Sequence, residues 1–170
     1  YVSCTFGAGG STLDYTPETV ARLHSEHGLA AAPHVSCVGG TRAELAALLE
    51  RYKSGGCRRI VALRGDLPSG MGHTGDFRYA SELVEFIRRE HDGCFHIEVG
   101  CYPEMHPQAD DAFADMRHFK AKVDAGADGA ITQYFYNADA YFRFVDDARA
   151  VGIEVPIVPG IMPISNFTQL

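Results

Sequence analysis

In the segment 60–66, two charged residues follow an apolar run. Residues 60–63 are Ile, Val, Ala and Leu, and Arg64, Gly65 and Asp66 follow them directly. Such a run suits a strand that is buried on both faces. Parallel α/β folds place their chemistry at the carboxyl ends of strands, where a carboxylate can stabilise a nearby cation. The segment therefore predicts an active-site rim, although cell-adhesion receptors also bind this tripeptide on exposed loops.

Polar residues also stand in or after the other strand-like runs. The carboxyl ends of parallel strands share one edge of a sheet, so side chains from different strands can surround one ligand. The polar residues include Thr5, His34, Tyr102, His106 and Gln133, and Phe6 and Ala8 stand beside Thr5 at the end of the first run. Taken singly, each has a structural explanation, such as a hydrogen-bonded core position for His34 or a turn for His106. Their collection on one rim favours a ligand site.

Six apolar runs of β type alternate with segments of helical periodicity. In the first helical segment Thr16 is a candidate N-cap ahead of Pro17, and Thr41 and Glu44 form a capping box at the second. Asn137 begins the fifth helical segment. The six apolar runs are 1–6, 32–37, 58–63, 95–101, 129–134 and 155–159.

The apolar stripes of the helical segments define the predicted core, because their spacing places them on one face of each helix. From the second segment to the fifth, the stripes are Leu45, Leu48, Leu49 and Tyr52; Leu83, Val84, Phe86 and Ile87; Phe113, Met116, Phe119 and Val123; and Tyr141, Phe142, Phe144, Val145 and Ala148.

Successive βα units fit either an open doubly wound sheet or a (β/α)8 barrel. A doubly wound sheet usually carries a G-x-G-x-x-G or Walker motif after its first strand, and the segment 7–12 matches neither. We therefore predict an α/β fold of the (β/α)8 TIM-barrel type, with about six consecutive βα units in one partial domain, residues 1–170. The strand-like start without Met predicts an internal piece of a longer protein.

Composition excludes several classes of protein. The 170 residues are 46% hydrophobic and carry a formal net charge of −7, which argues against a nucleic-acid or anionic-membrane surface. No apolar run approaches the roughly 20 residues of a membrane span. The five cysteines are scattered without a CxxC pair, which predicts a reduced, cytoplasmic protein. His24 and His27 lack an acidic partner at metal spacing, so we predict no metal site.

The ordered motifs of the chain resemble those of the methylenetetrahydrofolate reductases over essentially its whole length. The motifs are VSCTFGAGGST, AAPHVSC, IVALRGDLP, CYPEMHPQA, KVDAGADGAITQYFY and VPIVPGIMPISNF. The resemblance implies a flavin-binding catalytic domain that reduces 5,10-methylenetetrahydrofolate to 5-methyltetrahydrofolate. FAD would pass a hydride from NADH or NADPH to the folate, and the protein would be a homo-oligomer. It also implies a catalytic glutamate upstream of Tyr1 and a folate-binding arginine downstream of Leu170.

The resemblance assigns roles residue by residue. Asp66 is the implied catalytic residue, which also contacts the flavin and the pterin, and Gln133 and Gln169 are implied folate contacts. Lys122 is expected on an exposed helix face, where it would contact phosphate. The implied cofactor contacts are Thr5, Phe6, Ala8, His34, Arg64, Gly65, Asp66, Tyr79, Ala80, Tyr102, His106, Ala109, Asp115, His118 and Lys122.

Physical chemistry supports the role of Asp66 independently. Hydride transfer to an iminium needs the cation stabilised, and a carboxylate does so at close range. Two alternatives remain open from the sequence. One is another FAD-dependent barrel of the proline dehydrogenase kind, which would act on an amino acid. The other is a non-catalytic module that displays Arg64, Gly65 and Asp66 to a receptor.

Overall fold

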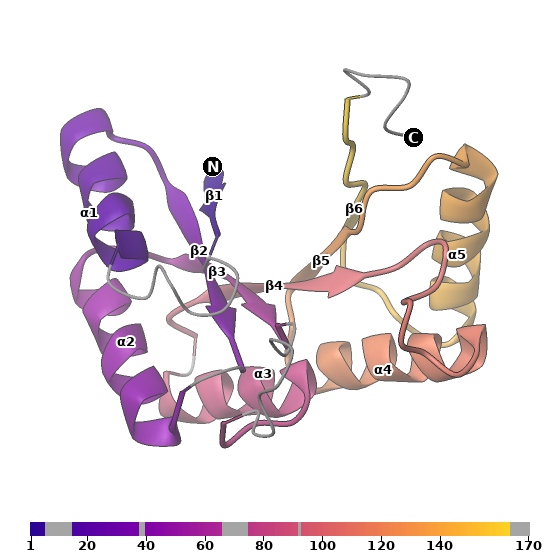
Figure 1. The fold of residues 1–170 in the computed structure, drawn as a ribbon, viewed down its shortest axis with the longest axis horizontal. Helices are drawn as coiled ribbons and strands as arrows, with labels where there is room; N and C mark the ends of the chain where they lie inside the picture. Colours follow the sequence, from indigo (N-terminus) through magenta and orange to yellow (C-terminus); the bar gives the residue numbers. More distant parts are fainter. Residues whose placement is uncertain (6–14, 38–39, 66–74, 92, 164–170) are drawn as a thin grey trace.

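The computed structural model describes residues 1–5, 15–37, 40–65, 75–91 and 93–163 (Figure 1). Strands and helices alternate along the whole chain. Their order is β1 (Val2–Cys4), α1 (Tyr15–His27), β2 (Ala31–Ser36), α2 (Arg42–Ser54), β3 (Arg59–Leu63), α3 (Ala80–Glu90), β4 (His96–Cys101), α4 (Ala112–Asp124), β5 (Gly129–Thr132), α5 (Ala138–Ala150) and β6 (Ile157–Val158).

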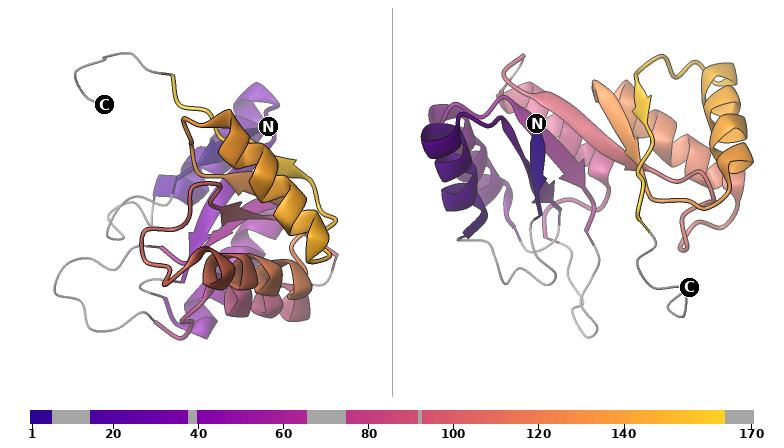
Figure 2. Two further views of the ribbon diagram at one scale, coloured as in Figure 1. Left: turned by 90° about the vertical axis from the view of Figure 1, so that its right-hand side faces the viewer. Right: turned by 90° about the horizontal axis from the view of Figure 1, so that it is seen from above.

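The strands form one parallel sheet of six, in the order β1-β2-β3-β4-β5-β6. The sheet is curled, and the helices follow one another around its outer side, as the view from above shows (Figure 2). Each strand therefore pairs with its neighbours in sequence, as consecutive βα units of a barrel require. The predicted α/β fold is confirmed, with the curled sheet of a partial barrel.

The main core lies between the sheet and the helices. Side chains alternate across each strand, so Ile60 and Ala62 of β3 and Ile97 and Val99 of β4 face the helices, and all four are fully buried. The helices contribute residues that were predicted for this face, including Leu45, Leu49, Leu83, Val84, Ile87, Phe119 and Phe144. Burial of these apolar side chains stabilises the βα units.

Two of the helix predictions were wrong. Helix α1 begins at Tyr15, so Thr16 lies inside the first turn, and its Oγ1 donates to the carbonyl of Thr5 at 3.0 Å instead of capping. Phe113 and Phe142 are 79% and 62% exposed, although periodicity placed them in the core. Both lie near helix starts at the edge of the packed face. In contrast, the Thr41–Glu44 capping box and the Asn137 N-cap are confirmed.

The concave face of the sheet holds a buried carboxylate. Strand register places Arg59, Glu98 and Gly129 on this face. Glu98 Oε1 accepts a hydrogen bond from Arg59 Nη1 at 2.6 Å and lies 3.0 Å from His96 Nε2. Glu98 Oε2 is buried and has no hydrogen-bond partner among the described residues. This oxygen lies against Gly129 of the neighbouring strand β5, and it has room there only because glycine lacks a side chain.

Gly129 leaves that room, so Gly129→Ala should destabilise the fold. A Cβ at Gly129 would overlap with Glu98 Oε2, and Arg59 and His96 hold that carboxylate in place. We expect a loss of about 1–3 kcal/mol in the free energy of unfolding, measured by urea denaturation. The matched control is Gly100→Ala, because its Cβ would meet only Leu63 Cδ2, at 3.9 Å. Equal losses in the two variants would show that Glu98 moves aside freely.

All five cysteines are free. Among the described residues, no helix is both long enough and apolar enough to cross a membrane.

Candidate functional site

A cavity of about 320 Å³ lies beyond the carboxyl ends of β3 and β4, beside the first turn of α3 and one side of α4. Its wall consists of Arg64, Tyr79, Ala80, Ser81, Tyr102, His106, Gln108, Ala109, Asp110, Asp115, His118 and Lys122. Most of these residues were predicted as cofactor contacts from separate motifs. The fold therefore brings distant parts of the chain to one space.

Lys122 provides a half-buried positive charge in this wall. Its ammonium donates a hydrogen bond to the carbonyl of Gly100 in β4. Burial lowers the pKa of Lys122, while Cys101 and Asp115 act in the opposite direction. The predicted exposed position is therefore wrong, because α4 packs this face toward the end of β4. An anion in the cavity would offset the cost of burying the ammonium.

Arg64 stands at the end of β3, where the chain turns. The next residue, Gly65, has a φ of 79°, a left-handed conformation that favours glycine. Ser36 Oγ at the end of β2 donates to the Arg64 carbonyl at 3.2 Å, which ties the two strand ends together. The guanidinium donates to the side-chain oxygen of Gln108. Arg64 is thus oriented into the cavity wall and keeps its positive charge.

His106 is held by its backbone and by its ring. The Asp115 Oδ2 atom, in the first turn of α4, accepts the backbone N–H of His106 at 2.9 Å. The backbone N–H of Gln108 donates to His106 Nδ1 at 3.0 Å. The Tyr102 ring packs edge-on against the imidazole, with centroids 4.5 Å apart. This turn therefore presents a fixed polar and aromatic surface.

A stacked pair forms the side of the cavity nearest α3. The rings of Tyr79 and His118 lie 5.6 Å apart with planes at 22°. Tyr79 is the N-cap residue of α3, and the Glu82 carboxylate accepts the backbone N–H groups of Arg78 and Tyr79 at 2.6 and 3.2 Å. This arrangement fixes the entry to α3 and sets Ala80 and Ser81 in the wall.

Four predicted residues are described but do not line this cavity: Thr5, His34, Gly65 and Gln133. His34 lies on the concave face of β2, where burial lowers its pKa. Gln133 follows β5, and its Oε1 accepts the backbone N–H of Tyr134 at 3.0 Å. Phe6, Ala8, Asp66 and Gln169 lie outside the described residues.

Three wall residues were not predicted: Ser81, Gln108 and Asp110. Each lies within one or two residues of a predicted position, so proximity in sequence was the available signal. Nothing in their types distinguished them from ordinary loop or helix-start residues. Among the described residues, no three His, Cys, Asp or Glu side chains gather as a possible metal site.

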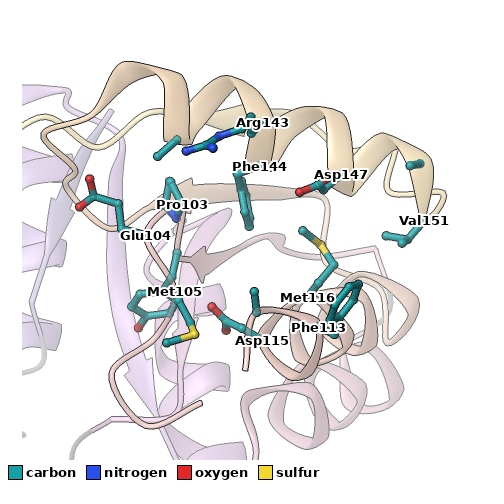
Figure 3. Close-up of a pocket in the computed structure, with 14 residues that line it drawn as sticks. Pro103, Glu104, Met105, Phe113, Asp115, Met116, Arg143, Phe144, Asp147 and Val151 are labelled. Atoms are coloured by element: carbon teal, nitrogen blue, oxygen red, sulfur yellow. The ribbon is translucent and has the colours of Figure 1, made fainter. Parts of the chain in front are cut away.

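A larger cavity of about 560 Å³ opens between α4 and α5 (Figure 3). Apolar side chains such as Phe113, Met116 and Phe144 dominate its wall, and Tyr102 and Asp115 border both cavities. Arg143 is the only Lys or Arg of its described lining. The smaller cavity instead combines Arg64 and Lys122 with aromatic rings. Charge and the predicted residues thus single out the smaller cavity, although it has less volume.

Comparison with known protein families identifies one matching model, described as methylenetetrahydrofolate reductase, over residues 1–170. The 5,10-methylenetetrahydrofolate reductase of Salmonella typhimurium is 46% identical over 169 residues, which are 99% of this chain and 56% of that protein. Methylenetetrahydrofolate reductase (NADH) 1 of Arabidopsis thaliana is 39% identical over 98% of this chain and 30% of its own. The chain thus spans about half the length of its bacterial relatives.

Solved structures support the fold alone. A 2,3-dimethylmalate lyase, a member of the PEP mutase/isocitrate lyase superfamily, superposes with a TM-score of 0.58 at 10% identity, covering 92% of this chain and 65% of its own. Phosphoenolpyruvate phosphomutase from Streptomyces platensis subsp. rosaceus gives 0.58 at 13% identity, covering 84% of this chain and 51% of its own. At such low identity the likeness concerns the arrangement of strands and helices.

Proposed function

Because the chain belongs to the methylenetetrahydrofolate reductase family, we propose that the full-length protein reduces 5,10-methylenetetrahydrofolate to 5-methyltetrahydrofolate. NADH or NADPH is the electron donor and FAD the bound cofactor. The observation that carries the proposal is the shared cavity, since separate family-like motifs supply its wall. The curled six-stranded sheet further supports completion of a (β/α)8 barrel by the rest of the protein.

The residues of the cavity fit FAD. Arg64 and Lys122 supply positive charge for a diphosphate, and His118 stands one helical turn before Lys122. Among the described residues, the Gly100 carbonyl is the one acceptor of the Lys122 ammonium, which has three N–H donors. The rings of Tyr79 and Tyr102 suit the flat ring systems of a flavin or an adenine. Cation and aromatic surface therefore occur together, as a dinucleotide requires.

The chain's own residues have separate roles in binding the cofactor and the folate. FAD, when bound, would supply the hydride that reduces the folate. Arg64, His118 and Lys122 bind and orient the cofactor, and Tyr102 and His106 form a rigid wall beside it. Asp66, the residue after Gly65, stabilises the cationic folate, and Gln133 and Gln169 contact the folate. Homo-oligomer formation remains a prediction from the family resemblance, and a cytoplasmic location remains a prediction from the scattered cysteines.

The test is an activity assay of the purified full-length protein with methylenetetrahydrofolate, using NADH and NADPH separately. We expect 5-methyltetrahydrofolate as the product and a protein that carries FAD. Proline serves as the competing substrate, because the alternative barrel flavoenzyme would oxidise it. Proline oxidation without folate reduction would overturn the proposal. Receptor display is less consistent with the structure, because Gln108 holds the Arg64 guanidinium in the cavity wall.

A further inference from the structure

Gln108 connects two of the functional side chains of the cavity. It lies on the connection between β4 and α4, two residues after His106, and it lines the cavity itself. Its side-chain oxygen accepts a hydrogen bond from Arg64 Nη2. Its backbone N–H donates to His106 Nδ1 at 3.0 Å. One residue therefore contacts both Arg64, which comes from the end of β3, and His106.

The contact with His106 fixes the proton on that ring. A backbone N–H can only donate, so the Nδ1 atom that it meets must be an acceptor. The neutral imidazole then carries its proton on Nε2. The Asp115 carboxylate holds the backbone of the same residue at 2.9 Å. His106 thus has one orientation and one tautomer before any ligand binds.

The contact with Arg64 fixes a long side chain that would otherwise occupy many rotamers. Ordering such a side chain costs conformational entropy, which weakens ligand binding if it is paid at that moment. The amide oxygen of Gln108 orders the guanidinium without cancelling its charge. The ligand then meets an arginine that already points along the cavity wall.

We propose that Gln108 is a positioning residue of this cavity, which orients Arg64 through its side-chain oxygen and sets the Nε2–H tautomer of His106 through its backbone N–H. The proposal rests on the proposed function for the identity of the ligand, FAD. The tautomer of His106 does not depend on any ligand. The two parts can therefore be tested separately.

The first test measures FAD binding to the full-length apoprotein by flavin fluorescence. Gln108→Ala should weaken binding about 3- to 10-fold, because it removes one hydrogen bond that orders Arg64. In an Arg64→Ala background, Gln108→Ala should have almost no further effect, because the two residues act as one unit. An equal effect of Gln108→Ala in both backgrounds would overturn the positioning role.

The second test reads the tautomer in the apoprotein. Nitrogen-15 NMR of labelled histidine distinguishes Nδ1–H from Nε2–H, and the His106 signals are assigned by their loss in His106→Gln. We expect the Nε2–H form in the parent and in Gln108→Ala, since that substitution retains the backbone N–H. An Nδ1–H form in the parent would contradict the inference. If the parent protein does not bind FAD, the proposed function is refuted, but the result on the His106 tautomer is not affected.

Discussion

Replacing Asp66 with Asn is expected to slow reduction of methylenetetrahydrofolate about a hundredfold in the full-length protein. The substitution retains size and most hydrogen bonding but removes the charge. At about 5 Å and an effective dielectric constant of about 20, the interaction of a carboxylate with a cation is worth roughly 3 kcal/mol. That energy corresponds to about a hundredfold in rate. The measurement is turnover at saturating folate.

A neutral electron acceptor gives the control for Asp66→Asn. NAD(P)H oxidation with an artificial quinone requires no cationic substrate, so its rate should be little changed or somewhat higher. The contrast between folate and quinone separates electrostatic stabilisation from a change in the shape of the site. Equal slowing with both acceptors would mean that Asp66 mainly shapes the site, and its electrostatic role would have to be abandoned.

Lys122→Ala should weaken FAD binding about 10- to 100-fold, because it removes a charge-assisted hydrogen bond to phosphate. The fold should remain intact. The variant loses the hydrogen bond to the Gly100 carbonyl, but it also removes an ammonium whose burial is unfavourable, as its lowered pKa shows. FAD retention through dilution and equilibrium titration both measure the effect.

Lys120→Ala is the matched control on the same helix. Lys120 forms an ion pair with Asp124, four residues along α4, and neither residue lines the cavity. Removal of the Lys120 side chain should leave FAD affinity unchanged, since it does not line the cavity. It should also leave the fold intact, since exposed ion pairs contribute little to stability. If the Lys122 variant retains FAD as well as the Lys120 variant does, Lys122 plays no part in cofactor binding.

Local patterns in the sequence were sufficient to predict the order of strands and helices. The run 60–63 lies in β3, where residues 60–62 are buried, and the Thr41–Glu44 capping box starts α2. Such signals depend on residues within one element, so they can be recognised without knowledge of the tertiary contacts. Thr16 failed as a cap because α1 already begins at Tyr15, and local sequence cannot reveal the contact of its hydroxyl with the distant Thr5 carbonyl.

The candidate site was predictable as a set of residues but not as a geometry. Motifs indicated Tyr79, Tyr102 and Lys122 separately, and only the sheet topology shows that they share a wall. The burial of Lys122 depends on how α4 packs against β4, which helical periodicity does not determine. The only sequence signal for Gln108 was its proximity to His106 and Ala109, because its role comes from a contact with Arg64, 44 residues away.

Hydrogen exchange of the full-length protein with and without FAD tests directly whether FAD binds in the smaller cavity. FAD is expected to slow exchange in residues 79–81 and 106–110, most of which line the smaller cavity. Exchange in residues 140–151, which border only the larger cavity, should remain unchanged. Protection confined to the larger cavity, with none at residues 79–81, would place the cofactor between α4 and α5 and contradict FAD binding in the smaller cavity.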